Sequence, residues 1–230
     1  MLTTNIYLLR HGKVNGLPAL YGQTDIDVTE TVNNKILSEL NTFQENSMNK
    51  ITHVVSSPLQ RCHQVAQQFS VQNNLPFIVE EDFKEMYFGD LDGVSFDEIR
   101  DSEHSEKSWH QLEQFWHNPS AHPLPKAESL LAFYQRVCTA WEQLLAQYQG
   151  NNILLVCHGG VIRMILSLLL KIEQSNQALY SQLTIKNNSI TLIKNISKKH
   201  CDSAKNAPKY SSVMCISTPL KCIAQNPEEF

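Results

Sequence analysis

Three short runs of apolar residues constrain the fold of this chain more than any other feature. They cover residues 6–9, 54–55 and 153–157, and each is too short to be a helix. Uninterrupted apolar runs of this kind are typical of strands that are covered on both faces of a sheet. Each run is followed within a few residues by helical spacing, and alternating strands and helices favour parallel pairing. We therefore expect an α/β fold: a three-layer sandwich with a mainly parallel sheet and helices on both faces.

The spacing of apolar residues predicts the other elements. The clearest helix covers 130–148, with Gly150 where a C-terminal glycine belongs. Residues 31–46 and 107–117 are expected to be helical as well. Ser57 and Pro58 suit the N-cap and first position of a further helix with one apolar face. Residues 189–196 and 210–216 are expected to form a strand pair near the sheet edge, joined by a polar loop over 197–209 whose role the sequence leaves open.

Length and composition favour a single domain. The chain has 230 residues, of which 42% are hydrophobic, and this is enough for one large α/β core. We expect this domain to cover 1–222, with a helical lid region around 95–125. Residues 223–230 are expected to form a loose C-terminal tail.

Composition also argues against several classes of protein. A net charge of −4 and a pI near 6.1 do not provide the basic surface that nucleic-acid binding requires. The longest apolar stretch, 153–172, is interrupted by His158, Arg163 and Lys171, so a membrane span is not expected. The six cysteines lack C-x-x-C spacing, and the N-terminal residues do not have the pattern of a signal peptide. We therefore expect reduced thiols in a cytoplasmic protein. The nine histidines also lack metal-ligand spacing, so we expect no metal and no cofactor.

Three of the predicted strands end at residues suited to phosphate chemistry. The first ends at Arg10 and His11, the second runs toward Arg61, and the third ends at His158. Ligands of open α/β sheets bind outside the carboxyl ends of the strands. One pocket could therefore collect two arginines and two histidines. Arg has a planar fork of donors that matches phosphoryl oxygens, and Gly159 begins a helix whose N-terminus favours an anion.

This set of residues can perform nucleophilic catalysis without a metal. A neutral imidazole can attack phosphorus to form a phosphohistidine, which divides one displacement into two. We expect His11 to be the nucleophile because it lies between Arg10 and Gly12 at the tip of the strand. His158 is expected to stay protonated and to stabilise the equatorial charge of the phosphoryl group. Which ring nitrogen attacks is not evident from the sequence.

Four ordered motifs resemble those of the histidine phosphatase superfamily, the phosphoglycerate mutase-like proteins. They are Leu-Arg-His-Gly at 9–12, Ser-Ser-Pro-Leu-Gln-Arg at 56–61, Glu-Met-Tyr-Phe-Gly-Asp-Leu-Asp-Gly at 85–93, and His-Gly-Gly at 158–160. The resemblance implies that Arg10, Arg61, His11 and His158 line a phosphate pocket. It also implies that Glu85 is the general acid, and a phosphate dianion beside a carboxyl group would favour its protonated form.

Two further residues are assigned to binding on the same resemblance. Gln23 and Thr24 lie in the segment that resembles the family's loop after the first motif. An ordinary polar turn is the alternative interpretation. Glu128 precedes the long helix and is expected to bond to the scaffold of the pocket, without a catalytic role.

The identity of the substrate is less constrained than the mechanism. Lys13, Val14 and Leu17 depart from the family pattern, which has Thr and Asn at the last two of these positions. The motifs most resemble the bacterial α-ribazole-5′-phosphate phosphatases of cobalamin biosynthesis, and aromatic residues at 109, 115 and 116 could stack on such a base. Sugar phosphates, a broad set of small phosphomonoesters, a phosphoglycerate mutase reaction and a non-enzymatic binding module are the alternatives. A homodimer is one possibility that the sequence leaves open.

Overall fold

The computed structural model describes residues 1–101, 105–197 and 210–227. Its sheet has six strands in the order β3-β2-β4-β1-β5-β6. The strands are β1 (Leu2–Arg10), β2 (His53–Ser56), β3 (Phe77–Val79), β4 (Asn152–Cys157), β5 (Ser189–Ser197) and β6 (Tyr210–Pro219). The first four in spatial order are parallel, whereas β5 runs antiparallel to β1 and β6 antiparallel to β5. The expected α/β fold with a mainly parallel sheet is confirmed, and the predicted strand pair is found at one edge.

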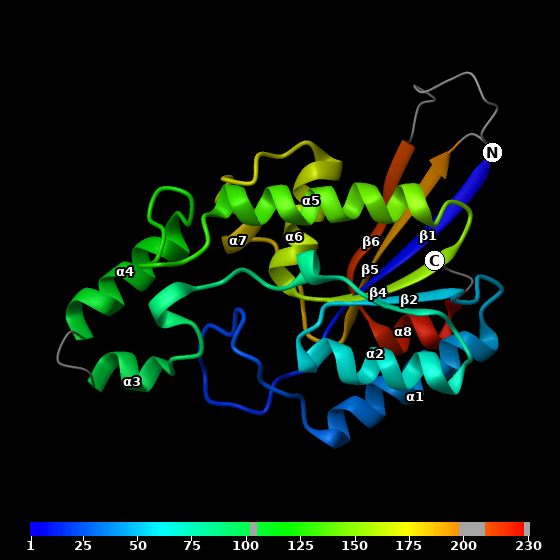
Figure 1. Ribbon diagram of the computed structural model, residues 1–230, viewed down its shortest axis with the longest axis horizontal. Coiled ribbons are helices and arrows are strands. Elements are labelled where there is room, and N and C mark those ends of the chain that lie inside the picture. The colour runs from blue at the N-terminus through cyan, green and yellow to red at the C-terminus, as the bar shows by residue number, and fades with distance from the viewer. Residues whose placement is uncertain (102–104, 198–209, 228–230) are drawn as a thin grey trace.

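Helices cover both faces of the sheet, as the sequence predicts (Figure 1). One face carries α1 (Glu30–Asn46), α2 (Gln60–Gln72) and α8 (Leu220–Gln225), and the other carries α5 (Leu130–Gln147) and α6 (Gly159–Leu170). Beyond the end of the sheet lie α3 (Phe96–Asp101) and α4 (Ser105–His117), within the region predicted to be a helical lid. The remaining elements are α7 (Ala178–Ser181) and the 3₁₀ turns η1 (Glu81–Phe83) and η2 (Gly89–Leu91).

The central strands explain the uninterrupted apolar runs. In β1, Ile6 and Leu8 belong to the core cluster that includes α5 and α6, and Tyr7 and Leu9 belong to the cluster that includes α1 and α2. Successive side chains of a strand point to opposite faces, and here both faces are covered. Each of the positions 6–9 must therefore be apolar.

The start of α2 corrects the sequence prediction. The helix begins at Gln60 and not at Pro58, and the residue before it carries no capping side chain. The Gln60 amide donates instead to Oδ1 of Asp25 at 2.7 Å. The Ser57 hydroxyl accepts from the Leu59 amide at 3.4 Å, before the helix begins, and lies 2.8 Å from Nε2 of His158. A cap supplied by a distant loop leaves no local pattern, which is why Ser57 was the more natural choice from the sequence.

The prediction of a loose tail from residue 223 is also wrong for the first part of that segment. Residues 220–225 form α8, and Leu220, Ile223 and Ala224 are buried in the same cluster as α1. A helix of six residues is too short for apolar periodicity to be visible. Residues 228–230 and most of the 197–209 loop lie outside the described residues. Within the described residues, no helix combines the length and the apolar character needed to cross a membrane.

Candidate active site

Two adjoining cavities lie at the carboxyl ends of β1 and β4, the edge that the sequence indicates. The first has a volume of about 510 Å³, and its walls include Arg10, His11, Glu85 and Gly159. The second has a volume of about 400 Å³ and shares Glu85 and three other lining residues with the first. Its outer walls come from α4, α5 and α7. Glu85 therefore lies at the boundary between the two cavities.

His11 follows the last residue of β1, and its ring is held in one orientation. Nδ1 lies 2.7 Å from the Gly12 carbonyl oxygen, so Nδ1 carries the proton. Burial and the positive charges of Arg61 and Arg10 lower the pKa of His11 to about 3. A neutral ring protonated on Nδ1 has its lone pair on Nε2. The geometry thus identifies the ring nitrogen that the sequence leaves open.

Arg10 lines the same cavity, and one donor of its guanidinium has no partner. Its Nη1 donates to the Ile185 carbonyl, whereas its Nε is buried and has no hydrogen-bond partner. Burial lowers the pKa of Arg10, but the group keeps its charge at neutral pH. An unpartnered guanidinium N–H is costly in a protein interior, and an anionic oxygen in the cavity would satisfy it.

His158 lies against His11, with 5.2 Å between the ring centroids, but it does not line either cavity. Arg61 Nε donates to its Nδ1 at 3.2 Å, and its Nε2 lies 2.8 Å from the Ser57 hydroxyl. Because Nδ1 accepts a hydrogen bond, the ring is neutral. Burial, assisted by the charge of Arg61, lowers the pKa of His158 well below its usual value. The ring is thus neutral when the cavity holds no anion, and the expected protonation of His158 beside a bound phosphate stays a prediction.

Arg61 is almost fully buried, with 1% of its surface exposed. Its Nη1 and Nη2 donate to the carbonyls of the loop that contains Gln23 and Thr24. Arg61 lines neither cavity. The structure therefore places it against His158 and not at the cavity wall. Its charge acts at short range on both histidines, as their lowered pKa values indicate.

The structure places Gln23 and Thr24 outside the cavity walls as well. Their backbone amides donate to the two carboxylate oxygens of Asp92, each at 2.9 Å. The Gln23 side chain reaches the Glu85 carbonyl at 3.4 Å, and Thr24 is exposed. Asp92, a residue of the third motif, therefore ties this loop to the segment that carries Glu85. The observed contacts match the interpretation of the loop as a polar turn.

Glu85 caps the N-terminus of α6. Its Oε2 accepts a hydrogen bond from the Gly160 amide at 2.9 Å, and its Oε1 accepts one from the Met86 amide at 3.0 Å. A Cβ atom at Gly160 would lie 2.1 Å from Oε1 of Glu85, so any other residue there would displace the carboxylate. The N-terminus of this helix was expected to favour an anion, and at Gly160 the carboxylate that approaches is that of Glu85.

Two site residues were missed by the sequence analysis. Arg163 lines both cavities, and its Nε and Nη2 donate to the carbonyls of Leu179 and Leu183. Arg163 is four residues after Gly159, so both lie on one face of α6. This spacing could have predicted that Arg163 faces the site. Asn187 also lines the first cavity and donates to the His11 carbonyl at 3.0 Å. Its position depends on the antiparallel pairing of β5 with β1, which the sequence does not reveal.

The residues that depart from the family pattern lie at the rim. Lys13, Val14 and Leu17 all line the first cavity, and Lys13 and Leu17 are exposed. Lys13 is therefore able to meet an anion that enters. Among residues 1–101, 105–197 and 210–227, the His, Cys, Asp and Glu side chains form no group of three that could hold a metal ion.

Comparisons with known proteins place these features in a family. The model of the histidine phosphatase superfamily (branch 1) matches residues 6–202. A protein of Hydrogenobacter thermophilus named "Putative phosphoserine phosphatase 2" is 29% identical over 182 residues, which cover 74% of this chain and 81% of that one. A protein of Yersinia pestis named as a probable phosphoglycerate mutase is 27% identical over 168 residues, 72% of this chain and 74% of that one.

The fold has close structural relatives. The α-ribazole phosphatase of Shigella flexneri superposes with a TM-score of 0.70 at 19% identity, over 93% of this chain and 96% of that one. At this identity the likeness concerns the fold alone. The family model, by contrast, spans most of the chain and includes the strand ends that form the cavity. The chain belongs to the histidine phosphatase superfamily, branch 1.

Proposed function

We propose that the protein is a phosphomonoesterase that works through a phosphohistidine on His11. The observation that carries the proposal is a neutral His11, with its lone pair on Nε2, beside a buried and unpartnered Nε of Arg10. The imidazole supplies the nucleophile, and the guanidinium supplies a donor for the phosphoryl oxygens.

The reaction follows in two steps. Nε2 of His11 attacks phosphorus, the bond from phosphorus to the ester oxygen breaks, and Glu85 gives its proton to the departing alcohol. A water molecule then attacks the phosphohistidine and transfers a proton to Glu85, which releases inorganic phosphate and restores both groups. His158 packs against the ring of the nucleophile, and Arg61 contributes charge from behind the two histidines. The positive charge that the reaction needs comes from the chain itself, without a metal.

Replacement of the nucleophile tests this mechanism. His11→Ala should lower kcat for an aryl phosphate by about 10³-fold or more and abolish acid-labile labelling of the protein by ³²P-substrate. His122→Ala removes an exposed histidine outside both cavities and should leave both readings unchanged. Full activity of His11→Ala would exclude the mechanism. Absence of turnover in the wild type would favour a binding module.

We propose α-ribazole 5′-phosphate as the substrate. The second cavity adjoins Glu85, where the leaving alcohol must lie, and its walls include Phe88, Phe115, Trp116 and Phe133. Aromatic walls suit a planar, uncharged base. Trp109, by contrast, packs against Phe96 and is not among the lining residues. The named activity of the Shigella structural relative is in line with this choice.

A matched pair of esters tests the substrate. Ribose 5-phosphate lacks the base, so kcat/KM for α-ribazole 5′-phosphate should exceed that for ribose 5-phosphate by about 10-fold or more if one ring is stacked and buried. Phe115→Ala should reduce this ratio while kcat/KM for ribose 5-phosphate is kept. Equal values for the two esters would leave only a broad-specificity or sugar-phosphate phosphatase.

A phosphoglycerate mutase is the second candidate, because one of the sequence relatives carries that name. Mutases retain the phosphoryl group long enough to return it to a second hydroxyl. The aromatic walls of the second cavity offer little to a small anionic acid such as 3-phosphoglycerate. We expect hydrolysis of aryl phosphate to be faster than isomerisation of 3-phosphoglycerate, and robust isomerisation with negligible hydrolysis would reverse the assignment.

A further inference from the structure

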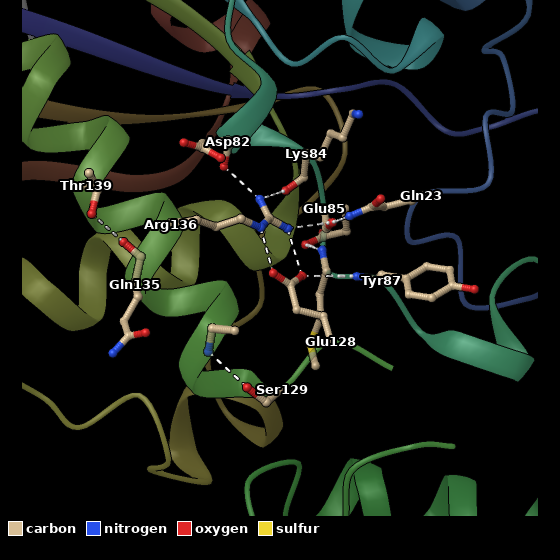
Figure 2. A network of polar contacts seen from close by, with 12 residues as sticks. Gln23, Asp82, Lys84, Glu85, Tyr87, Glu128, Ser129, Gln135, Arg136 and Thr139 are labelled. Carbon is tan, nitrogen blue, oxygen red and sulfur yellow. Dashed lines mark hydrogen bonds and ion pairs between the residues drawn. The ribbon is translucent and has the colours of Figure 1, made fainter. Parts of the chain in front are cut away.

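The segment that carries Glu85 is held by an arginine on a different element. Arg136 lies on α5 and donates to three backbone carbonyls of the segment 82–85. Nη1 donates to the carbonyl of Asp82 at 2.7 Å and to that of Lys84 at 2.8 Å, and Nη2 donates to that of Glu85 at 3.0 Å. Figure 2 shows the guanidinium between this segment and Glu128. Three of its hydrogen bonds therefore go to the main chain around the proposed general acid.

Glu128 completes the arrangement. Its Oε1 accepts from Nε of Arg136 at 2.7 Å, and its Oε2 accepts from Nη2 at 2.9 Å. Oε2 also lies 3.4 Å from the Tyr87 amide, and the Glu128 amide donates to the Tyr87 carbonyl at 3.0 Å. All five N–H groups of the guanidinium are thus used. Residues on both sides of Glu85 are tied to the start of α5 (Figure 2).

The placement and burial of this pair argue for more than a surface ion pair. Only 19% of the Arg136 side chain and 16% of the Glu128 side chain are exposed, so the pair is screened less than one at the surface. An ion pair alone would use two of the five donors, whereas here the other three fix backbone carbonyls. Catalytic groups must be held within a fraction of an ångström, by partners that are themselves fixed.

We propose that Arg136, fixed by Glu128, is a positioning residue for Glu85. It holds the backbone at 82–87 so that the Glu85 carboxylate reaches the Gly160 amide at the boundary of the two cavities. The inference rests on the proposed role of Glu85 as general acid. Arg136 contacts no substrate in this arrangement, because it lines neither cavity. Its effect on the reaction is therefore an effect on proton transfer to the leaving oxygen.

Esters with different leaving groups test this positioning role. 4-Nitrophenol leaves readily without a proton, whereas a sugar hydroxyl needs one, so ribose 5-phosphate reports on the acid and 4-nitrophenyl phosphate does not. Arg136→Gln should lower kcat/KM, which reports the step in which the leaving group departs, by about 10- to 100-fold for ribose 5-phosphate and by much less for 4-nitrophenyl phosphate. Glu85→Gln should show the same leaving-group dependence. Gln135→Ala, at the exposed neighbouring position of α5, should match the wild type.

Each outcome separates the claims. If Arg136→Gln does not fold, as judged by circular dichroism, Glu128→Gln preserves the shape of the site and should show the same selective loss. Equal losses for the two esters, or no loss, in the folded variant would overturn the positioning role. A Glu85→Gln variant without leaving-group dependence would refute the general acid. A wild type that hydrolyses neither ester would overturn the proposed function itself.

Discussion

The protonation state of His11 follows from its position at the end of a buried strand. The residue has 7% of its surface exposed, and its ring lies near two guanidinium groups and donates from Nδ1 to the carbonyl of the next residue. Each of the first two factors disfavours the imidazolium. A nucleophile needs a lone pair, and this environment keeps one available at a pH at which a free histidine would be largely protonated.

The pH dependence of His11 can be predicted with its sign. The pKa of His11 in the folded protein is about 3, against 6.5 for a free histidine. The neutral ring of His11 should therefore persist as the pH falls from 7 to 4. NMR of ring-labelled protein, with His11→Asn to assign the signal, should show no titration of His11 over that range. An inflection near pH 6.5 would contradict the prediction.

The same shift affects stability. The unfolded chain takes up a proton on His11 and on His158 below about pH 6.5, whereas the folded chain does not. The contribution of these two rings to stability is therefore present above pH 6.5 and is lost as the pH falls toward the lowered folded-state values.

Single residues also mark the limit of sequence-based prediction. Arg10, His11 and Gly159 were predicted to meet because each ends a strand or begins a helix at one edge of the sheet. Three partners of Arg61 could not be predicted, because they are backbone carbonyls of a loop 37 to 40 positions earlier in the chain. Composition and periodicity do not predict such contacts, because the contacts form only when the loop folds over the strand ends.

At the scale of elements, long helices were easier to predict than short ones. Helix α5 has 18 residues, enough for apolar periodicity to be clear, whereas α8 has six. The stability of α8 comes from its contacts with the cluster that also includes α1, since so short a helix is not stable alone. The lid action of the region that contains α3 and α4 stays a prediction.

The packing of α8 can be tested by cavity creation. Ile223 is 1% exposed, so Ile223→Ala should reduce the free energy of unfolding by about 2–4 kcal/mol, as measured by urea titration. Lys221→Ala, in the same helix but exposed, should change it by less than about 0.5 kcal/mol. Equal effects of the two substitutions would mean that α8 does not pack as described.

At the scale of the molecule, the topology explains why distant motifs share one cavity. β2, β4 and β1 are neighbours and parallel, so the residues that follow them meet at one edge. This much follows from the alternation of strands and helices in the sequence. The sheet order does not, and neither does the antiparallel entry of β5 that brings Asn187 to the His11 carbonyl.

Charge at this scale leads to a final prediction. The chain carries a net charge of −4, so the overall field does not attract a phosphate dianion. Positive charge is instead concentrated at the cavity, where Arg10, Arg163 and Lys13 line the wall and α6 begins. Because these groups can neutralise a phosphoryl group, turnover should survive treatment with EDTA followed by desalting, and added Mg²⁺ or Zn²⁺ should not raise it. Loss of activity with the chelator and recovery with a divalent ion would show that the local charge is insufficient.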